Sequence, residues 1–184
     1  MNIRKSEPSV FAVVGGKHSG KTTTIEALIK ELSTRGYKVA AVKHVSEQNL
    51  ALDTKGKDTW RYAKAGASII LGVAAREIVT IEKVTTEKFS IKEILERIGD
   101  CDIVMLEGFK ESVKSRKDVA KIVAVKSNEE ALEAKKMFSP IIAFTGPNSL
   151  EGLGLKIPYV NVLKDIGRLA DLVEDVINGE MRKG

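Results

Sequence analysis

The chain has 184 residues, a length that suits one domain of ordinary size with its own hydrophobic core. Its composition is 43% hydrophobic and 30% charged, with a net charge of +5, which is typical of a globular protein and excludes an intrinsically disordered one. Cys101 is the only cysteine and His18 and His44 are the only histidines, so an intrachain disulfide is excluded and a closed zinc site within one chain is not expected.

Other compositional features narrow the function classes. The first nine residues lack the apolar segment of a secretory signal, and no run of about 18 apolar residues could span a membrane. Aromatic residues make up only 5% of the chain, which leaves little for the base-stacking surfaces of single-strand nucleic-acid binders. We therefore expect a cytoplasmic protein without a membrane or nucleic-acid partner.

Short β-type runs alternate with amphipathic helical stretches along the chain. The first run, residues 10–14, is continuously apolar, and apolar residues then recur at helical spacing from Lys21 to a plausible helix stop at Gly36. Capping-box patterns that begin at Ser90 and Ser127 predict two further helix starts. The remaining predicted strands are residues 38–42, 68–73, 78–81, 102–106, 121–125, 140–144 and 159–162. The remaining predicted helices are residues 58–65 and the stretch that ends at Gly179.

This alternation predicts an α/β fold of the P-loop NTPase type, with a mostly parallel twisted sheet and helices on both faces. No linker or internal repeat interrupts it, so residues 1–184 are expected to form one nucleotide-binding domain with a core at about 10–178. In such a sheet, ligands bind at the carboxyl ends of the strands. The motifs that follow these strands are therefore the candidates for a functional site.

The strongest motif follows the first strand, where residues 15–22 match the pattern Gly-x-x-x-x-Gly-Lys-Thr in full. Backbone N–H groups of such a loop wrap a β-phosphate, and the positive end of the next helix faces the same negative charge. We expect Lys21 to reach the β- and γ-phosphate oxygens and Thr22 to ligate Mg²⁺. The expected phosphate-binding residues are Gly15, Gly16, Lys17, His18, Ser19, Gly20, Lys21, Thr22 and Thr23.

A second motif places carboxylates at the two ends of the predicted strand 102–106. Glu107 comes at the carboxyl end of this apolar strand, the position from which a carboxylate holds the metal of a P-loop site. We therefore predict that Glu107 is a metal ligand together with Thr22. Asp102 lies at the opposite end of the strand, so we expect it to be a capping residue at the start of the strand rather than a metal ligand.

Three further residues follow the predicted strand 38–42. Asp53 could contact Mg²⁺ or position a water molecule, so it joins Lys21 and Glu107 as a candidate catalytic residue. Asp58 could act in the same way, or it could cap the helix that it precedes. His44 is either a substrate contact or an ordinary surface histidine.

The motifs taken together resemble the molybdopterin-guanine dinucleotide biosynthesis protein B family, over about residues 10–178. The first block alone is shared by many families, whereas the later blocks, in this order, are far more specific. The blocks are residues 15–23; Lys43-His44 with 53–58 and 65–67; and Glu107-Gly108-Phe109-Lys110 with 120–123.

The resemblance implies a GTP-binding homodimer with weak Mg²⁺-dependent GTPase activity. Its partner would be the guanylyltransferase that joins GMP to molybdopterin, the last step to the guanine dinucleotide form of the molybdenum cofactor. No Asn-Lys-x-Asp motif for guanine occurs, so guanine specificity comes from the resemblance alone; the loop at residues 145–148 follows a strand where a base could lie.

A small-molecule kinase is the alternative function. The charged residues 110–119 are expected to form a mobile loop, and in a kinase they could instead close over the phosphates as a lid through Arg116. His44 or Asp53 would then contact the phosphate acceptor. A nickel-insertion GTPase is disfavoured because such proteins carry clusters of cysteine and histidine.

Overall fold

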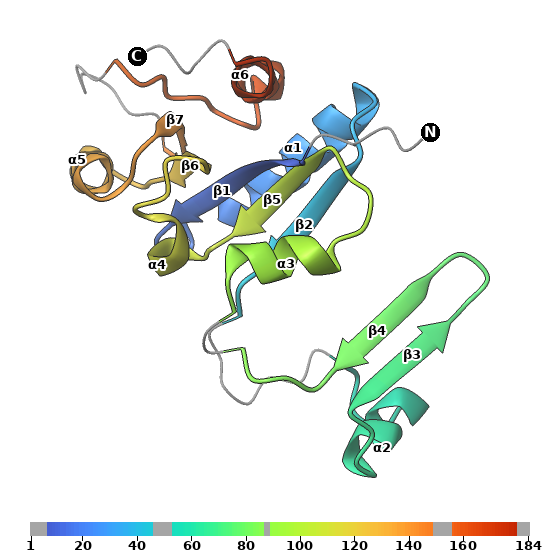
Figure 1. The fold of residues 1–184 in the computed structure, drawn as a ribbon. Helices are drawn as coiled ribbons and strands as arrows, with labels where there is room; N and C mark the ends of the chain where they lie inside the picture. Colours follow the sequence, from blue (N-terminus) through green and yellow to red (C-terminus); the bar gives the residue numbers. More distant parts are fainter. Residues whose placement is uncertain (1–6, 46–52, 87–88, 149–155, 180–184) are drawn as a thin grey trace. The chain divides into compact units, whose positions relative to one another are not determined.

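The computed structural model describes residues 7–45, 53–86, 89–148 and 156–179 (Figure 1). The chain divides into two compact units, one of residues 1–44 and 95–184 and the other of residues 45–94. The predicted P-loop and the carboxylates of the strand 102–106 belong to the first unit. The prediction of a single nucleotide-binding domain stays a prediction.

The first unit is built on a five-stranded parallel sheet, which confirms the predicted fold class. The strands are β1 (Ser9–Gly15), β2 (Val39–Lys43), β5 (Ile103–Glu107), β6 (Ala120–Ala124) and β7 (Ile141–Thr145). Their order is β2-β5-β1-β6-β7, and every pair is parallel. The central strand β1 therefore delivers the loop that follows it to the middle of the carboxyl edge of the sheet.

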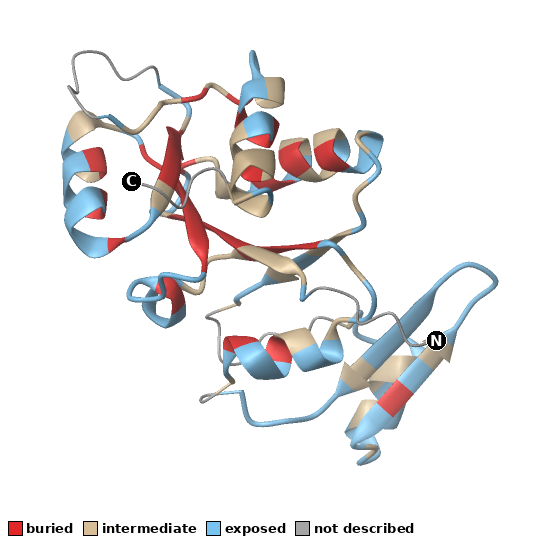
Figure 2. Cartoon of the chain, turned by 45° about the horizontal axis from the view of Figure 1, so that its top comes forward, coloured by how far each residue is buried: buried red, intermediate tan, exposed pale blue. Residues whose placement is uncertain are grey.

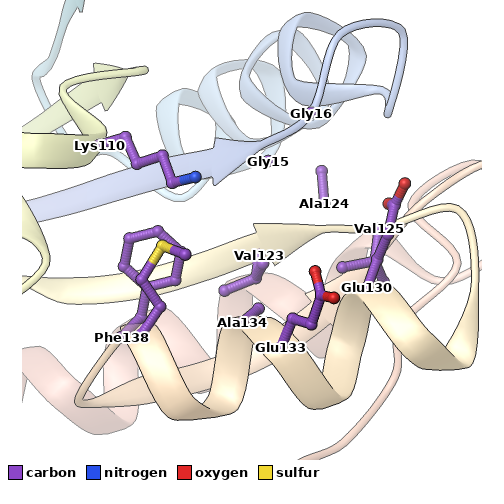
Figure 3. A pocket seen from close by; sticks show the side chains of 11 residues that line it. Gly15, Gly16, Lys110, Val123, Ala124, Val125, Glu130, Glu133, Ala134 and Phe138 are labelled. Atoms are coloured by element: carbon purple, nitrogen blue, oxygen red, sulfur yellow. The ribbon is translucent and has the colours of Figure 1, made fainter.

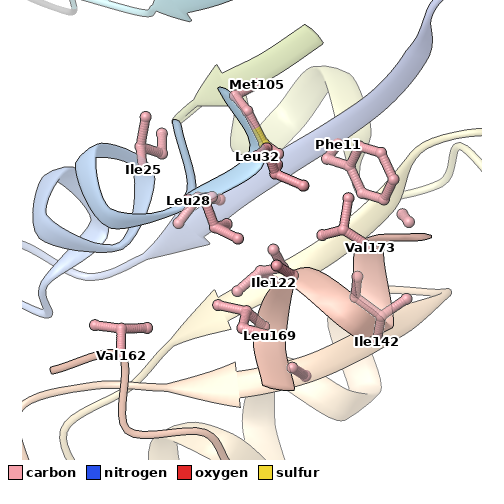
Figure 4. Close-up of a cluster of buried hydrophobic side chains, with 14 of the residues drawn as sticks. Phe11, Ile25, Leu28, Leu32, Met105, Ile122, Ile142, Val162, Leu169 and Val173 are labelled. Atoms are coloured by element: carbon pink, nitrogen blue, oxygen red, sulfur yellow. The ribbon is translucent and has the colours of Figure 1, made fainter. Parts of the chain in front are cut away.

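Helices α1 (Lys21–Thr34) and α6 (Ile166–Ile177) cover one face of this sheet. Leu28 and Leu32 of α1 and Leu169 of α6 are fully buried against alternate residues of the strands, including Phe11 and Ile122 (Figure 4). The helical spacing of apolar residues after Lys21 thus gives the predicted buried face. This packing fixes the start of α1 directly after the P-loop.

The opposite face of the sheet is buried as well. Ala12, Val14 and Leu106 alternate with the residues that face α1 and are fully buried. On this side lie the short helix α4 (Lys110–Val113) and α5 (Asn128–Met137), in front of the sheet and beside it in Figure 1. Helices on both faces explain why the strands read as continuous apolar runs rather than alternating ones.

Lys121, the second residue of β6, is fully buried although it is charged. Its Nζ donates to the main-chain oxygen of Ser139 at 2.7 Å and to that of Arg116. Burial lowers the pKa of Lys121 from 10.5 to about 8, while nearby Asp118 opposes the shift. The side chain ties the segment before β6 to the segment before β7.

This buried amine makes the stability of the chain depend on alkaline pH. The folded amine loses its proton near pH 8 but the unfolded one only near pH 10.5, so the unfolded state binds more protons between these values. Relative to a Lys121→Met variant, the free energy of unfolding of the native sequence should therefore rise from pH 8 to pH 10, by at most ~1.4 kcal/mol per pH unit. Urea denaturation of both proteins at pH 7, 8, 9 and 10 measures this difference, and a difference that stays flat or falls contradicts the assignment.

The second unit contains helix α2 (Asp58–Lys64) and the antiparallel hairpin of β3 (Ile69–Val73) and β4 (Ile78–Glu82). One face of the hairpin packs on α2, where Ile70 is buried and Gly72 lies against the methyl group of Thr59. The side chains of Ile69, Leu71 and Val73 point to the other face and are exposed, and most residues of both strands are coloured as exposed in Figure 2. This other face carries the largest group of exposed apolar side chains of this unit.

Seven predicted strands are present, each within one residue at either end, and the hairpin at 69–82 is confirmed. Two predictions are wrong. Residues 159–162 do not form a strand, because only Tyr159 forms a bridge, to Phe144. Residues 110–119 are not simply a mobile loop. They begin with α4, and the side chains of Val113 and Val119 are buried, which anchors the segment at two points.

The boundary between the two units falls within helix α3 (Ile91–Arg97). The capping box predicted at its start is present in both directions: Ser90 N–H donates to Glu93 Oε2 at 2.7 Å, and Glu93 N–H donates to Ser90 Oγ at 3.2 Å. Within the described residues, no helix combines the length and the apolar character that a membrane crossing needs.

Candidate functional site

The loop after β1 holds its shape through three residues with positive φ. Gly15 has φ 151°, His18 58° and Gly20 93°. A Cβ added at Gly15 would lie 2.1 Å from the main-chain oxygen of Ala124, so only glycine fits where the loop leaves the sheet. His18 contributes through its backbone conformation, as the sequence predicts. These turns curl the main chain around a concave space in front of α1.

Side chains of the same loop hold it closed. Ser19, which is fully buried, donates its Oγ–H to the main-chain oxygen of Gly16 at 2.9 Å. The Lys21 ammonium donates to the same oxygen at 2.5 Å, and the Thr24 hydroxyl donates to Gly20 at 2.9 Å. Lys21 therefore already lies across the mouth of the loop, where the phosphates of a nucleotide would bring their negative charge.

The carboxylate predicted at the end of β5 meets the loop. Glu107 Oε1 accepts from the Thr22 hydroxyl at 2.9 Å and lies 3.3 Å from the ammonium of Lys43. The side chain of Glu107 is only 13% exposed, so its charge is held in a partly dry position beside these two partners. The predicted pair of Thr22 and Glu107 is thus brought together, whereas the contribution of Lys43 is not foreseen by sequence.

The electrostatics of the loop are set by lysines. Burial lowers the pKa of Lys21 from its ordinary value, Glu107 raises it, and the charges of Lys43 and Lys126 lower it further. Lys43 and Lys126 therefore both add positive charge near Lys21 at the carboxyl edge of the sheet, while Glu107 and Glu130 are the carboxylates that pair with them. This excess of positive charge favours a polyphosphate anion at the loop.

The oxygen ligands at this point fit Mg²⁺. Mg²⁺ binds hard oxygen ligands at about 2.0–2.1 Å in an octahedron, so neighbouring ligands lie about 2.9 Å apart. The Thr22 hydroxyl and Glu107 Oε1 have this separation. The same two groups can therefore take adjacent positions around one ion, with phosphate oxygens and water completing its shell.

The turn after Glu107 is strained. Gly108 has φ 86° and Phe109, a residue with a side chain, has φ 53°. The ring of Phe109 lies 5.3 Å from the ring of His44, centroid to centroid, at a tilt of 59°. His44 also donates its N–H to the main-chain oxygen of Glu107 at 3.0 Å. His44 is thus an exposed residue, as the surface alternative predicted, and its ring and main-chain N–H support the turn; its role as a substrate contact stays a prediction.

Asp53 belongs to the second unit. Its Oδ1 accepts from Thr54 N–H at 2.7 Å and from the Thr59 hydroxyl at 3.2 Å, while Oδ2 is buried without a partner among the described residues. Its catalytic role stays a prediction. Asp58 is the first residue of α2 and Lys57 is the N-cap, so the capping alternative for Asp58 is wrong. Its negative charge still suits the positive end of the helix.

The other carboxylate of the strand, Asp102, fixes the start of β5, as its position at that end of the strand predicts. Its Oδ2 accepts from Lys38 N–H at 2.7 Å, and its own N–H donates to Lys38 O at 2.9 Å. These bonds join the entries of β2 and β5, far from the P-loop end of the strands. Arg116, the candidate lid residue, pairs with Asp118.

Residues that directly follow β6 and β7 contact one another at the carboxyl edge of the sheet. Asn148 Nδ2 donates to the main-chain oxygen of Lys126 at 3.0 Å, and the Tyr159 hydroxyl donates to that of Gly146 at 2.8 Å. A Cβ at Gly146 would lie 1.9 Å from the main-chain oxygen of Val125. These contacts hold the loop at residues 145–148, of which Thr145 is the last residue of β7. Sequence reasoning did not identify Lys126 or Tyr159, because only the strand order brings them together.

Comparison with known proteins shows which family the chain resembles. A family model described as molybdopterin guanine dinucleotide synthesis protein B matches residues 10–145. A Methanocaldococcus jannaschii relative is 38% identical over 122 residues, which are 65% of this chain and 48% of that protein. The molybdopterin-guanine dinucleotide biosynthesis adapter protein of Haemophilus influenzae is 36% identical over 55% of this chain and 57% of its own length. The chain thus spans about half the length of these curated relatives.

Solved structures agree with the fold. A crystal structure of molybdopterin-guanine biosynthesis protein B superposes with a TM-score of 0.67 at 26% identity, covering 92% of this chain and 99% of that one. A homolog from Bacillus stearothermophilus gives a TM-score of 0.66 at 22% identity, covering 93% and 99%, and supports the fold alone.

Proposed function

Because the chain belongs to the molybdopterin guanine dinucleotide synthesis protein B family, we propose that it is a GTP-binding accessory protein that assists formation of molybdopterin guanine dinucleotide. The observation that carries the proposal is the P-loop with the Thr22 hydroxyl 2.9 Å from Glu107. Relatives described as adapter proteins for this biosynthesis support the accessory role. A cytoplasmic location belongs to the same proposal.

Binding of the triphosphate follows from the loop. Main-chain N–H groups from Gly16 to Thr22 and the positive end of α1 surround the β-phosphate, and Lys21 exchanges its bond to Gly16 for phosphate oxygens. Thr22 and Glu107 hold Mg²⁺, which neutralises the β- and γ-phosphate oxygens when bound. Lys43 stays beside Glu107, where its ammonium group lies 3.3 Å from Oε1, the same oxygen that accepts from the Thr22 hydroxyl.

Hydrolysis is expected to be slow. The phosphate-facing hollow of about 360 Å³ is lined by residues 18–23, none of which is arginine or glutamine. P-loop enzymes that hydrolyse GTP quickly use an arginine to stabilise the transition state and a glutamine to orient water, and the arginine alone contributes about 10³-fold or more. The chain is therefore suited to hold GTP until a partner, which we take to be the guanylyltransferase, supplies such groups.

The guanine base is assigned to the corner formed by Lys126, Asn148 and Tyr159. The strand order brings the ends of β6 and β7 next to the end of β1, so a base attached to a phosphate tail in the loop falls near them. The aliphatic part of the Lys126 side chain offers an apolar surface, and backbone groups near Gly146 and Asn148 offer hydrogen bonds. Support for a homodimer comes from the exposed face of the β3–β4 hairpin.

Calorimetry with GTP and ATP, each with and without Mg²⁺, tests the proposal. GTP should bind more tightly than ATP, and its affinity should rise when Mg²⁺ is present. In a Glu107→Gln variant the Mg²⁺-dependent gain should fall at least about tenfold, because the neutral amide is a weaker ligand for a divalent cation, while Mg²⁺-free binding should be retained.

Two outcomes would overturn the assignment. One is tighter binding of ATP than of GTP by the native chain. The other is transfer of the γ-phosphate to a small-molecule acceptor rather than to water, which labelled GTP and ATP would reveal and which is the behaviour of the alternative kinase.

A further inference from the structure

A pocket of about 220 Å³ lies beside the start of the P-loop, on the side of the sheet covered by α5, and the proposed function does not use it. Gly15 and Gly16 line its inner end, Val123 lines the sheet side, and Lys110 and Glu133 lie across it from one another (Figure 3). All of these residues belong to the first unit. The pocket is therefore a neighbour of the nucleotide loop within one compact body.

The apolar part of the pocket suits a flat ring. Val123, Ala134 and Phe138 line it and are each less than 8% exposed, so this wall is rigidly packed. Met137, at 41% exposed, closes the outer side with a flexible side chain. A volume of about 220 Å³ is below the range of pockets for drug-sized ligands and fits one small ring system.

The polar part of the pocket has one free carboxylate and one ammonium group. Glu130 is already used, since its carboxylate accepts from Lys126 N–H at 2.8 Å and lies 3.5 Å from the Lys126 ammonium. Glu133 lies one turn further along α5 and makes no hydrogen bond or ion pair with any other described residue. Lys110 reaches toward Gly15 from the opposite side (Figure 3).

The position of Lys110 depends on the strained turn before it. Phe109 has φ 53°, a left-handed conformation that is unfavourable for a residue with a side chain. Such strain persists where the surrounding structure requires it and is common at ligand sites. Here it turns the chain after Glu107 so that Lys110 begins α4 at the edge of the pocket.

We propose that this pocket binds a heterocycle with a 2-amino-4-oxopyrimidine edge, the edge that pterins and guanines share. The Glu133 carboxylate would accept hydrogen bonds from the ring N–H and the 2-amino group, Lys110 would donate to the 4-oxo group, and the ring would pack on Val123 and Phe138. The inference rests on the proposed function, whose substrate class it names.

Fluorescence titration of the full chain with 6-hydroxymethylpterin, with and without GTP and Mg²⁺, tests the pocket. The pterin should bind the native chain, and Glu133→Gln should weaken this binding at least about tenfold, because an amide cannot accept both N–H bonds as a charged carboxylate does. Lys110→Met should weaken it as well. Glu26→Gln, on the exposed side of α1, is the matched control and should leave pterin binding unchanged.

Competition by guanosine and GTP distinguishes a pterin ligand from a guanine ligand, since both carry the 2-amino-4-oxopyrimidine edge. Pterin binding that guanosine and GTP leave intact supports a pterin ligand. Displacement by both supports a guanine ligand in this pocket and would overturn the assignment of the guanine base to the corner of Lys126, Asn148 and Tyr159. Binding of neither compound, or equal pterin binding by the native chain and Glu133→Gln, overturns the inference. If GTP still binds in that case, the proposed function stands without the pocket; loss of GTP binding in the native chain is the separate failure of the proposed function.

Discussion

A Lys21→Ala variant is expected to lose GTP binding by at least ~10-fold while it keeps its fold. The ammonium group is the charged donor that already lies across the P-loop mouth, on Gly16 O at 2.5 Å, and a charge-assisted bond to phosphate contributes about 1.5–3 kcal/mol. Its removal also reduces the positive charge that Lys43 and Lys126 maintain around the loop. Calorimetry with GTP and Mg²⁺ measures the loss, and circular dichroism with a thermal melt checks the fold.

Lys17→Ala is the matched control for this variant. Lys17 lies in the same loop and its side chain is exposed, so the variant removes an equal charge but keeps the backbone N–H that the loop offers to phosphate. Its affinity for GTP should stay within a few-fold of that of the native chain. Unchanged affinity in Lys21→Ala would mean that the phosphates bind somewhere other than the loop after β1, and an equal loss in both variants would mean that the general charge of the loop, rather than a specific bond from Lys21, holds them.

The parts of this site that sequence predicts are those that depend on local patterns. A buried strand, a glycine-rich loop and an amphipathic helix in direct succession leave little choice for the backbone, so the positions of Lys21 and Thr22 follow from residues 10–32 alone. Glu107 is predictable for a similar reason, because an apolar strand followed by a carboxylate and glycine places the carboxylate at the ligand edge.

The parts that sequence misses depend on which strands become neighbours. Lys43 faces Glu107 because β2 lies next to β5 in register, and no local pattern states that order. Lys121 resembles an ordinary charged strand residue, yet its amine is buried and donates to main-chain oxygens of Arg116 and Ser139, in the segments before β6 and before β7. The charge of residues 110–119 likewise hides the two valines that anchor them, Val113 and Val119. In each case tertiary contacts decide the environment of a side chain.

The second large effect concerns the hairpin of β3 and β4, whose outer face is apolar. Ile69, Leu71, Val73 and Ile78 are between 59% and 71% exposed, and Val73 and Ile78 are directly paired across the strands. A two-stranded hairpin is marginally stable in water by itself, and the opposite face already uses α2 for its packing. An exposed apolar face of this kind marks an interaction surface. The proposed homodimer provides its occupant, a second copy of the same hairpin.

Replacing Leu71 and Val73 together by glutamate should therefore convert a dimer into a monomer. In a two-fold symmetric contact each substitution is present twice, so four apolar side chains, each contributing about 1.5–3 kcal/mol when buried, become four carboxylates that repel one another. The dissociation constant should rise at least ~100-fold. Analytical ultracentrifugation over a series of concentrations, with GTP calorimetry on the same samples, measures both association and the integrity of the P-loop unit.

Leu163→Glu is the matched control, since Leu163 is 80% exposed but belongs to the first unit. If exposure of any apolar side chain promoted association, this variant would also dissociate, and if the hairpin face is the interface it should remain dimeric. The double variant should also keep its affinity for GTP, because the loop after β1 and Glu107 lie in the other unit. A native chain that is monomeric at micromolar concentration, or a double variant that stays dimeric, would assign the hairpin face to another partner, of which the guanylyltransferase is the first to test.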